Sequence, residues 1–173
     1  MKKVAVFGNT GAGKSTTSKK LAEITSLPLY VLDTIKYRSG GREVPHDKYL
    51  DAHSQILACD EWVIDGFGCL ESTWKRLSEA DTLVYIDLPI RVHFFRVTKR
   101  FLKGLFFPPV GWPENTPLFK STLTSYRVLW LCHKKLTPKY RQFVAKAESS
   151  KEVYHLRSRA EILNFLNTLQ SRY

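Results

Sequence analysis

Cysteine is scarce in this chain of 173 residues, and its placement follows no known pattern. The three cysteines, Cys59, Cys69 and Cys132, are odd in number and form no CxxC pair. A disulfide framework needs paired cysteines, and a structural zinc site needs closely spaced cysteines and histidines. Because the five histidines are also scattered, the sequence predicts reduced thiols and no metal cluster built from these residues.

Long apolar runs are absent as well. No stretch approaches the roughly 18 residues that a membrane-spanning helix needs. Near the N-terminus two lysines precede an apolar run, but that run is only four residues long (Val4 to Phe7) and leads into glycines, so we expect a strand and not a signal peptide. Together with a hydrophobic content of 43%, this predicts a single soluble domain over residues 1–173, cytoplasmic and without a membrane partner.

Acidic residues are scarce in the second half of the chain. Residues 1–87 contain 11 Lys and Arg against 12 Asp and Glu, whereas residues 88–173 contain 16 against 4, a net charge of +12. A basic half is typical of proteins that bind nucleic acid, an anionic membrane surface or a polyphosphate. Composition alone favours none of the three.

What the chain does contain is a regular alternation of short apolar runs with amphipathic segments. Strands are predicted within residues 4–7, 27–32, 62–64, 83–86 and 153–156, and helices over 14–25, 46–59, 70–79, 89–103, a segment ending near 134, 138–148 and a C-terminal segment after Ser158. This order predicts an α/β fold with a parallel sheet covered by helices on both faces. Ligands of such folds bind beyond the carboxyl ends of the strands, where Gly8, Asp33, Asp65 and Asp87 all lie.

The first strand leads into a phosphate-binding loop. Residues 8–15, GNTGAGKS, match the pattern GxxxxGK[ST] between a predicted strand and a predicted helix. Glycines let successive N–H groups converge on phosphate oxygens, the lysine reaches the β- and γ-phosphates, and the serine hydroxyl ligates Mg²⁺. We therefore expect ATP and Mg²⁺ as cofactors, with nucleotide contacts from Gly8, Asn9, Thr10, Gly11, Ala12, Gly13, Lys14, Ser15 and Thr16.

Two aspartates are candidates for the second protein ligand of Mg²⁺, beside Ser15. Asp65 and Asp87 each end an apolar strand, the placement of the aspartate that orders Mg²⁺ and its waters. We favour Asp65, with Ser15, as the metal-binding pair, because the Leu88-Pro89 that follows Asp87 is typical of a strand-to-helix junction. An aspartate that only caps the next turn remains the alternative for both.

Arginines flank a proline-rich segment that we expect to form a lid over residues 101–120. Arg96 and Arg100 are four residues apart and hence on one helical face, while Arg91 and Lys99 point elsewhere, toward water. Arginines of this kind neutralise charge on the phosphoryl group in transfer. With Lys14, we therefore predict catalytic roles for Arg96, for Arg100 and for Arg127 on the helix after the lid.

These residues together resemble the adenylate-kinase-like branch of P-loop kinases. The resemblance lies in GNTGAGKS, in VIDGF (63–67) and in the Arg96/Arg100 pair, in the same order along the chain. LPLYVLDTI, DEWVIDG, LVYIDLP and HLRSRAEILNFL are similar to the DNA topology modulation proteins, which are related to adenylate kinase, and the similarity extends over nearly the whole chain outside residues 104–120. It implies a P-loop NTPase fold with five parallel strands in the order 2-3-1-4-5, a small acceptor-side insertion, here residues 34–60, and a lid.

The acceptor half of the reaction is less clearly marked. In WVIDGFGCL (62–70), Gly68 and Cys69 stand where adenylate kinases have the proline and arginine that hold the acceptor nucleotide. A phosphate acceptor would then need Arg38, Arg42 or Arg76, whereas a hydroxyl acceptor would use Asp33 as a base, as in shikimate- and gluconate-kinase-like enzymes. The favoured prediction is a kinase acting on a nucleoside monophosphate. The alternatives are a kinase of a non-nucleotide hydroxyl acceptor and a nucleotide-regulated nucleic-acid-binding protein.

Overall fold

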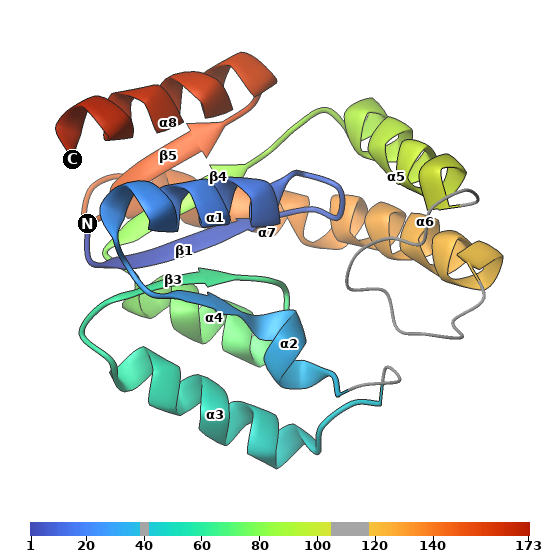
Figure 1. Cartoon of the computed structure of the whole chain (residues 1–173), viewed down its shortest axis with the longest axis horizontal. Helices are drawn as coiled ribbons and strands as arrows, with labels where there is room; N and C mark the ends of the chain where they lie inside the picture. The colour runs from blue at the N-terminus through green and yellow to red at the C-terminus, as the bar shows by residue number, and fades with distance from the viewer. Residues whose placement is uncertain (39–41, 105–117) are drawn as a thin grey trace.

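A five-stranded parallel sheet forms the centre of the computed structural model (Figure 1). Its strands are β1 (Lys3–Gly8), β2 (Leu29–Val31), β3 (Trp62–Asp65), β4 (Thr82–Ile86) and β5 (Glu152–Leu156). They are hydrogen-bonded in the order β2-β3-β1-β4-β5, all in parallel. The predicted P-loop NTPase topology is confirmed. The structure describes residues 1–38, 42–104 and 118–173, apart from the side chains at 100, 103, 104 and 118–122.

Side chains of the central strand alternate between two apolar cores. Val4 and Val6 point to one face of the sheet, while Ala5 and Phe7 point to the other, as the two-residue period of a strand requires. Helices α1 (Lys14–Thr25) and α8 (Arg159–Arg172) cover the first face. Helices α3 (His46–Ala58), α4 (Leu70–Glu79) and α7 (Thr137–Ala147) cover the second. Strands buried on both faces explain why the sequence shows continuous apolar runs.

The acceptor-side insertion begins with a helix that the sequence did not predict. Helix α2 (Leu32–Lys36) has only five residues, too few for a helical period to be visible in the sequence. It is followed by an isolated bridge between Tyr37 and Glu43, and then by α3.

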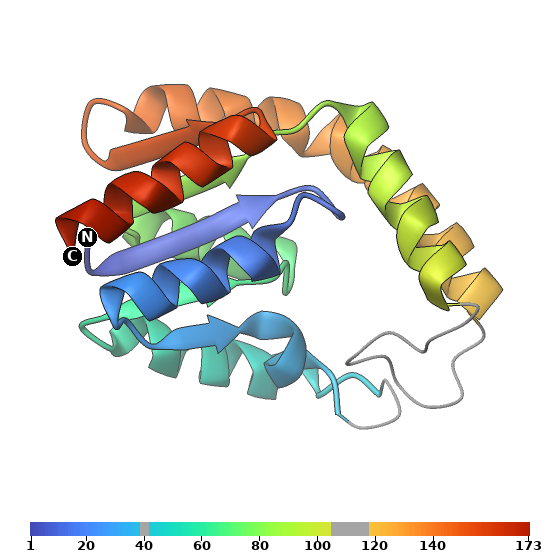
Figure 2. The same cartoon turned by 45° about the horizontal axis from the view of Figure 1, so that its top comes forward.

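Two helices stand across the carboxyl ends of the strands. α5 (Ile90–Gly104) and α6 (Leu118–Lys135) lie side by side beyond the arrowheads of the sheet (Figure 2). Stacking of Phe94 on Tyr126, with ring centroids 5.6 Å apart, joins the two helices. The predicted lid overlaps the end of α5 and the start of α6, but its aromatic residues Phe106, Phe107 and Trp112 lie outside the described residues.

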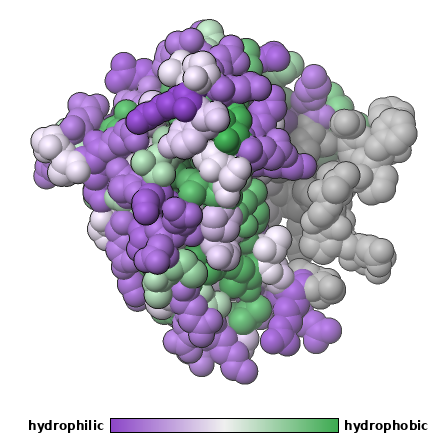
Figure 3. All heavy atoms as spheres, turned by 60° about the vertical axis from the view of Figure 1, so that its left-hand side comes forward, coloured by the Kyte–Doolittle hydropathy of each residue, from purple (hydrophilic) through white to green (hydrophobic). Residues whose placement is uncertain are grey.

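The face of the molecule drawn in Figure 3 is largely polar. On the face drawn in Figure 3, hydrophilic residues surround a narrower strip of hydrophobic ones. Among the described helices, none is both long enough and apolar enough to cross a membrane.

Candidate active site

The loop between β1 and α1 has the backbone shape of a phosphate cradle. Gly8, Gly11 and Gly13 all have positive φ, at 148°, 75° and 94°. A Cβ at Gly8 would stand 2.3 Å from the carbonyl oxygen of Ile86 on the neighbouring strand, so only glycine fits there. Gly13 directly precedes α1, and the loop N–H groups therefore converge at the positive end of that helix.

Lys14 lies inside this loop. Its ammonium group donates a hydrogen bond to the carbonyl oxygen of Asn9 at 3.1 Å. Burial lowers the pKa of Lys14, while the nearby carboxylates of Asp65 and Asp33 oppose that shift. The ammonium group of Lys14 therefore lies within the loop and close enough to both carboxylates to interact with them.

A cavity of about 720 Å³ opens over the loop. Residues of α8 and of α5 contribute to its walls. It is lined by Thr10, Gly11, Ala12, Gly13, Lys14, Ser15, Thr16, Thr17, Lys20, Asp33, Asp65, Gly66, Phe67, Arg96, Val97, Arg159, Ile162, Leu163 and Leu166. Its volume is within the range of small-molecule sites. The predicted nucleotide-binding residues 10–16 all line it.

Two carboxylates line this cavity, Asp65 at the end of β3 and Asp33 in the first turn of α2. Asp65 ends β3 and pairs in register with Val31 of β2, and Asp33 follows two residues beyond Val31. Asp33 Oδ1 lies close to Gly66, 3.3 Å from the position that a Cβ would occupy there. Burial raises the pKa of the Asp33 carboxyl, the ammonium of Lys14 opposes this, and the negative charge of Asp65 adds to it.

The residues around Asp65 suit a magnesium ion. Asp65 is 1% exposed, and its Oδ1 has no hydrogen-bond partner among the described residues. Mg²⁺ prefers oxygen ligands and is usually held by one or two carboxylates together with waters and phosphates. Asp65 and the Ser15 hydroxyl, both on the cavity wall, offer this donor set. Within the described residues, no group of three or more His, Cys, Asp or Glu side chains forms a self-contained metal site.

Asp87, the competing aspartate, is engaged elsewhere. Its carboxylate accepts hydrogen bonds from Arg141 Nε at 2.7 Å and Nη2 at 3.1 Å, and it contacts His155 Nε2 at 3.0 Å. It does not line the cavity. This arrangement supports a structural role for Asp87, so Asp65 is the better candidate for the metal ligand.

The arginines predicted to act in catalysis have different positions. Arg96 lines the cavity and donates hydrogen bonds to the carbonyl oxygens of Gly11 at 3.1 Å and Ala12 at 2.7 Å. The side chain of Arg100 lies outside the described residues. Arg127 is exposed on α6 and is not part of the cavity wall, so the structure does not bring it to the phosphate loop.

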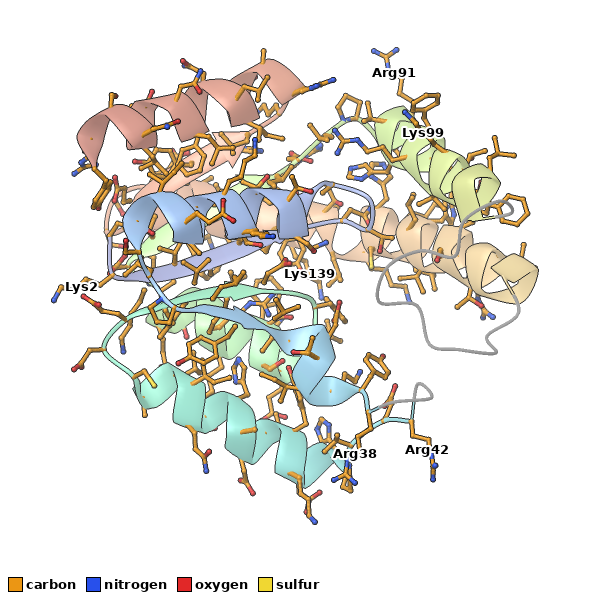
Figure 4. All side chains as sticks on the ribbon, in the orientation of Figure 1. Lys2, Arg38, Arg42, Arg91, Lys99 and Lys139 are labelled. Carbon is orange, nitrogen blue, oxygen red and sulfur yellow. The ribbon has the colours of Figure 1, made fainter. Side chains whose placement is uncertain are left out.

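The three arginines predicted to hold an acceptor phosphate do not line the cavity. Arg38 and Arg42 are exposed near the start of α3, joined by a main-chain hydrogen bond, and lie far from the sheet (Figure 4). Arg76 of α4 is 1% exposed, and its Nε and Nη1 have no hydrogen-bond partner among the described residues. Its charge, after the larger effect of burial, helps to lower the pKa of the buried His53 to about 4.

Comparisons with known proteins reveal the fold. No family model matches the chain, and no curated protein sequence is significantly similar to it. Solved structures do match. A shikimate kinase from Acinetobacter baumannii in complex with shikimate superposes with a TM-score of 0.62 at 17% identity, covering 99% of this chain and 94% of that one. A shikimate kinase from Bacteroides thetaiotaomicron gives a TM-score of 0.57 at 17% identity, covering 98% and 96%. The chain has the fold of these P-loop kinases.

Several side chains at the site carry no signal in the sequence. His93 of α5 is 2% exposed, with Nδ1 2.8 Å from the carbonyl oxygen of Thr10 and Nε2 3.1 Å from that of Leu88. The Asn9 amide donates to the carbonyl oxygen of Leu129 on α6 at 3.1 Å. Because these side chains contact main-chain atoms of distant segments, no residue pattern predicts them. The phosphate loop is thus attached to both α5 and α6.

Proposed function

We propose that this protein is an ATP- and Mg²⁺-dependent phosphotransferase that phosphorylates a hydroxyl group of a small-molecule acceptor. The observation that carries the proposal is the placement of Asp33. Its carboxylate shares one cavity with the phosphate loop, Lys14 and Asp65, at the mouth of the acceptor-side insertion. A hydroxyl acceptor needs a group that takes its proton, and a phosphate acceptor does not.

Each residue has a defined part in this reaction. The loop N–H groups and Lys14 bind the β- and γ-phosphates of ATP. Ser15 and Asp65 would hold Mg²⁺, which neutralises charge on the phosphate oxygens when it is bound. Arg96 exchanges the carbonyl oxygens of Gly11 and Ala12 for oxygens of the transferring phosphoryl group. Asp33 accepts the proton of the acceptor hydroxyl, and because the pKa of its carboxyl is raised, it is a stronger base than an aspartate with the usual pKa.

The hypothesis that the acceptor is a nucleoside monophosphate has less support than the hydroxyl-acceptor hypothesis, for a physical reason. A phosphate acceptor requires cationic side chains that converge on its phosphate. Arg38, Arg42 and Arg76 are absent from the cavity wall, and the Gly68-Cys69 pair offers no cation. The similar solved structures, which are named as kinases of shikimate and not of a nucleotide, also favour the hydroxyl acceptor.

An acceptor panel tests the proposal. Purified protein with ATP and Mg²⁺ is offered shikimate and other hydroxy acids, sugars, nucleosides and nucleoside monophosphates, and ADP release is followed for each. We expect acceptor-dependent ADP only with hydroxyl compounds, and its loss in Asp33→Asn. Turnover of a nucleoside monophosphate that survives Asp33→Asn would instead establish the phosphate acceptor. If protein that binds ATP releases no acceptor-dependent ADP with any of these compounds, both the hydroxyl-acceptor and the phosphate-acceptor hypotheses are contradicted.

A further inference from the structure

Helices α5 and α6 carry an unusual concentration of exposed apolar side chains. Six of the eleven large hydrophobic residues that are exposed in the described part of the chain belong to these two helices. Phe95 is 67% exposed, Leu123 61% and Trp130 47%. Five of the six, all but Val128, form with nearby exposed basic residues a surface that we call the outer face. It is made of Arg91, Phe95, Lys99 and Leu102 of α5 and Leu123, Arg127, Trp130, Leu131 and Lys134 of α6.

The spacing of these residues gives each helix one continuous stripe. Residues 91, 95, 99 and 102 of α5 follow one another at intervals of four, four and three, so that they lie on one side at 100° per residue. In α6, residues 123, 127, 130 and 134 follow one another at intervals of four, three and four, and so also lie on one side of their helix. Within each stripe, basic and apolar side chains alternate. Figure 4 shows Arg91 and Lys99 pointing away from the sheet.

The two stripes fall on the same side of the helix pair. α5 contacts α6 through Phe94 and Thr98, which meet Tyr126, and these contacts lie about a quarter turn from the stripe in each helix. The helices run in opposite directions, since α5 ends where α6 begins (Figure 1). In each helix the stripe follows the contact residues by about a quarter turn in the direction in which the helix winds. Because the two helices are antiparallel and face each other, this rotation leads to the same side of the pair in both, so the two stripes form one surface.

This surface is turned away from the cavity. Arg96 and Val97, which line the cavity, and His93, which contacts the phosphate loop, lie on the other side of α5. A partner that covered the outer face would therefore leave the nucleotide site open.

The charge of the two helices is of one sign. α5 and α6 contain nine Lys and Arg and no Asp or Glu. None of the outer-face basic residues belongs to a salt bridge between described residues. Lys134 instead lies over the ring of Trp130, with its ammonium 4.9 Å from the ring centroid. The complementary partner is thus polyanionic.

We propose that the outer face docks on an anionic membrane surface. The outer face combines arginine and lysine with Phe, Leu and Trp, which is the composition typical of helices that lie at a membrane interface. The apolar side chains of such helices enter the boundary between headgroups and acyl chains, while their cations bind lipid phosphates. A nucleic acid would match the charge and could stack on Phe95 or Trp130. It would gain little from Leu102, Leu123 and Leu131, whereas a lipid surface uses all of them. The docking is peripheral, so it needs no spanning helix.

Vesicle co-sedimentation tests this docking. The full chain is mixed with vesicles of pure phosphatidylcholine, or of phosphatidylcholine containing one third phosphatidylglycerol, at low and at high salt. We expect binding to the anionic vesicles only, weakened by salt. The double variant Phe95→Ser/Trp130→Ser should lower the partition coefficient by about tenfold or more, and Lys99→Glu should lower it several-fold.

Matched variants separate docking from general effects. Leu70→Ser removes an equally exposed apolar residue, on α4, and Lys2→Glu makes the same charge change at the far end of the molecule (Figure 4). Both should bind vesicles like the wild type, and circular dichroism and thermal melting report whether every variant is folded.

The same variants are tested against labelled single-stranded and duplex DNA. Vesicle binding that Lys2→Glu weakens as much as Lys99→Glu would overturn the proposal, because the outer face would then have no special role. Absence of binding to anionic vesicles by the folded wild type would overturn it directly. DNA binding that depends on Phe95, Trp130 and Lys99 without vesicle binding would assign the face to nucleic acid instead.

Discussion

The Arg96 guanidinium donates a hydrogen bond to the carbonyl oxygen of Ala12 at 2.7 Å, across 84 residues of sequence. This bond attaches α5 to the phosphate loop, and Arg96 also lines the cavity over that loop. A main-chain carbonyl is a weaker partner for a guanidinium than a phosphate oxygen, because a charged acceptor forms the stronger hydrogen bond. If the protein binds ATP as proposed, we therefore expect the phosphates to compete with these carbonyl oxygens for Arg96.

Replacing Arg96 by Ala should lower kcat by about 10²–10³-fold, because the residue meets the phosphoryl group in transfer. Lys99→Ala, on the exposed side of the same helix, should leave kcat within about twofold. Steady-state ADP release with a saturating acceptor measures both. A loss of melting temperature in Arg96→Ala without a loss of kcat would instead mean that the residue only holds α5 in place.

Asp33→Asn should lower kcat by about 10²–10⁴-fold while ATP binding stays intact, because the variant keeps the shape of the side chain and loses the base. The wild-type rate should fall as the pH drops through the pKa of Asp33. Since desolvation of the carboxyl raises that pKa, this fall begins at a higher pH than for an aspartate with the usual pKa. A pH profile of kcat between pH 4 and pH 8, with ATP affinity measured separately, checks this. An acid limb that persists unchanged in Asp33→Asn would assign it to another group.

Features set by local chemistry were predictable from the sequence. Ser15 follows the P-loop lysine in a motif whose spacing is fixed by phosphate geometry. Asp65 could be placed at the edge of the sheet because an apolar run ends there and parallel strands end at the same edge. The five strands, and seven helices to within a few residues of their ends, follow from hydrophobic periodicity in the same way.

Features set by tertiary packing were not predictable. Arg76 is predicted to face solvent or to bind a phosphate, yet it is 1% exposed and lies on the same side of α4 as the buried Thr73 and Leu77. Periodicity assigns a charged residue to the solvent-facing side of a helix, and only the packing of the folded chain shows that Arg76 lies on the buried side. His93 was missed for the same reason, because its partners are main-chain oxygens of the phosphate loop and of Leu88.

Asp87→Asn should lower the free energy of unfolding by about 2 kcal/mol at pH 7. The carboxylate is 6% exposed and loses charged hydrogen bonds, although Arg141 is half exposed and screened by water. Burial of Asp87 would raise its pKa, but the hydrogen bonds from Arg141 and His155 outweigh this and lower it. Because the pKa of Asp87 is lower in the folded than in the unfolded protein, its ionised carboxylate stabilises the fold. This stabilisation is fully present above the unfolded-state pKa of about 3.9 and is lost as the pH falls through the folded-state pKa. Urea unfolding at pH 7 and near pH 3 should therefore show the difference between wild type and variant shrinking in acid, and a constant difference would contradict the ion pair.

Gly68→Ala should be the most destabilising of the glycine substitutions outside the phosphate loop. Gly68 has φ +66°, and a Cβ there would lie 1.9 Å from the Tyr49 hydroxyl oxygen and 2.8 Å from Ser72 Oγ, two atoms joined by a hydrogen bond. The positive φ costs about 1–2 kcal/mol and the overlap about 1–3 kcal/mol more. Gly11→Ala is the matched control, since it has φ +75° but its nearest neighbour is 3.4 Å away, so it should show the first cost alone. Urea unfolding of both variants, and of Gly68→Ala combined with Tyr49→Ala, measures the two costs. If the overlap with Tyr49 causes the second cost, Gly68→Ala should destabilise the Tyr49→Ala variant less than it destabilises the wild type. Equal losses of unfolding free energy in Gly68→Ala and Gly11→Ala would show that the Tyr49 side chain adds no steric cost at this turn.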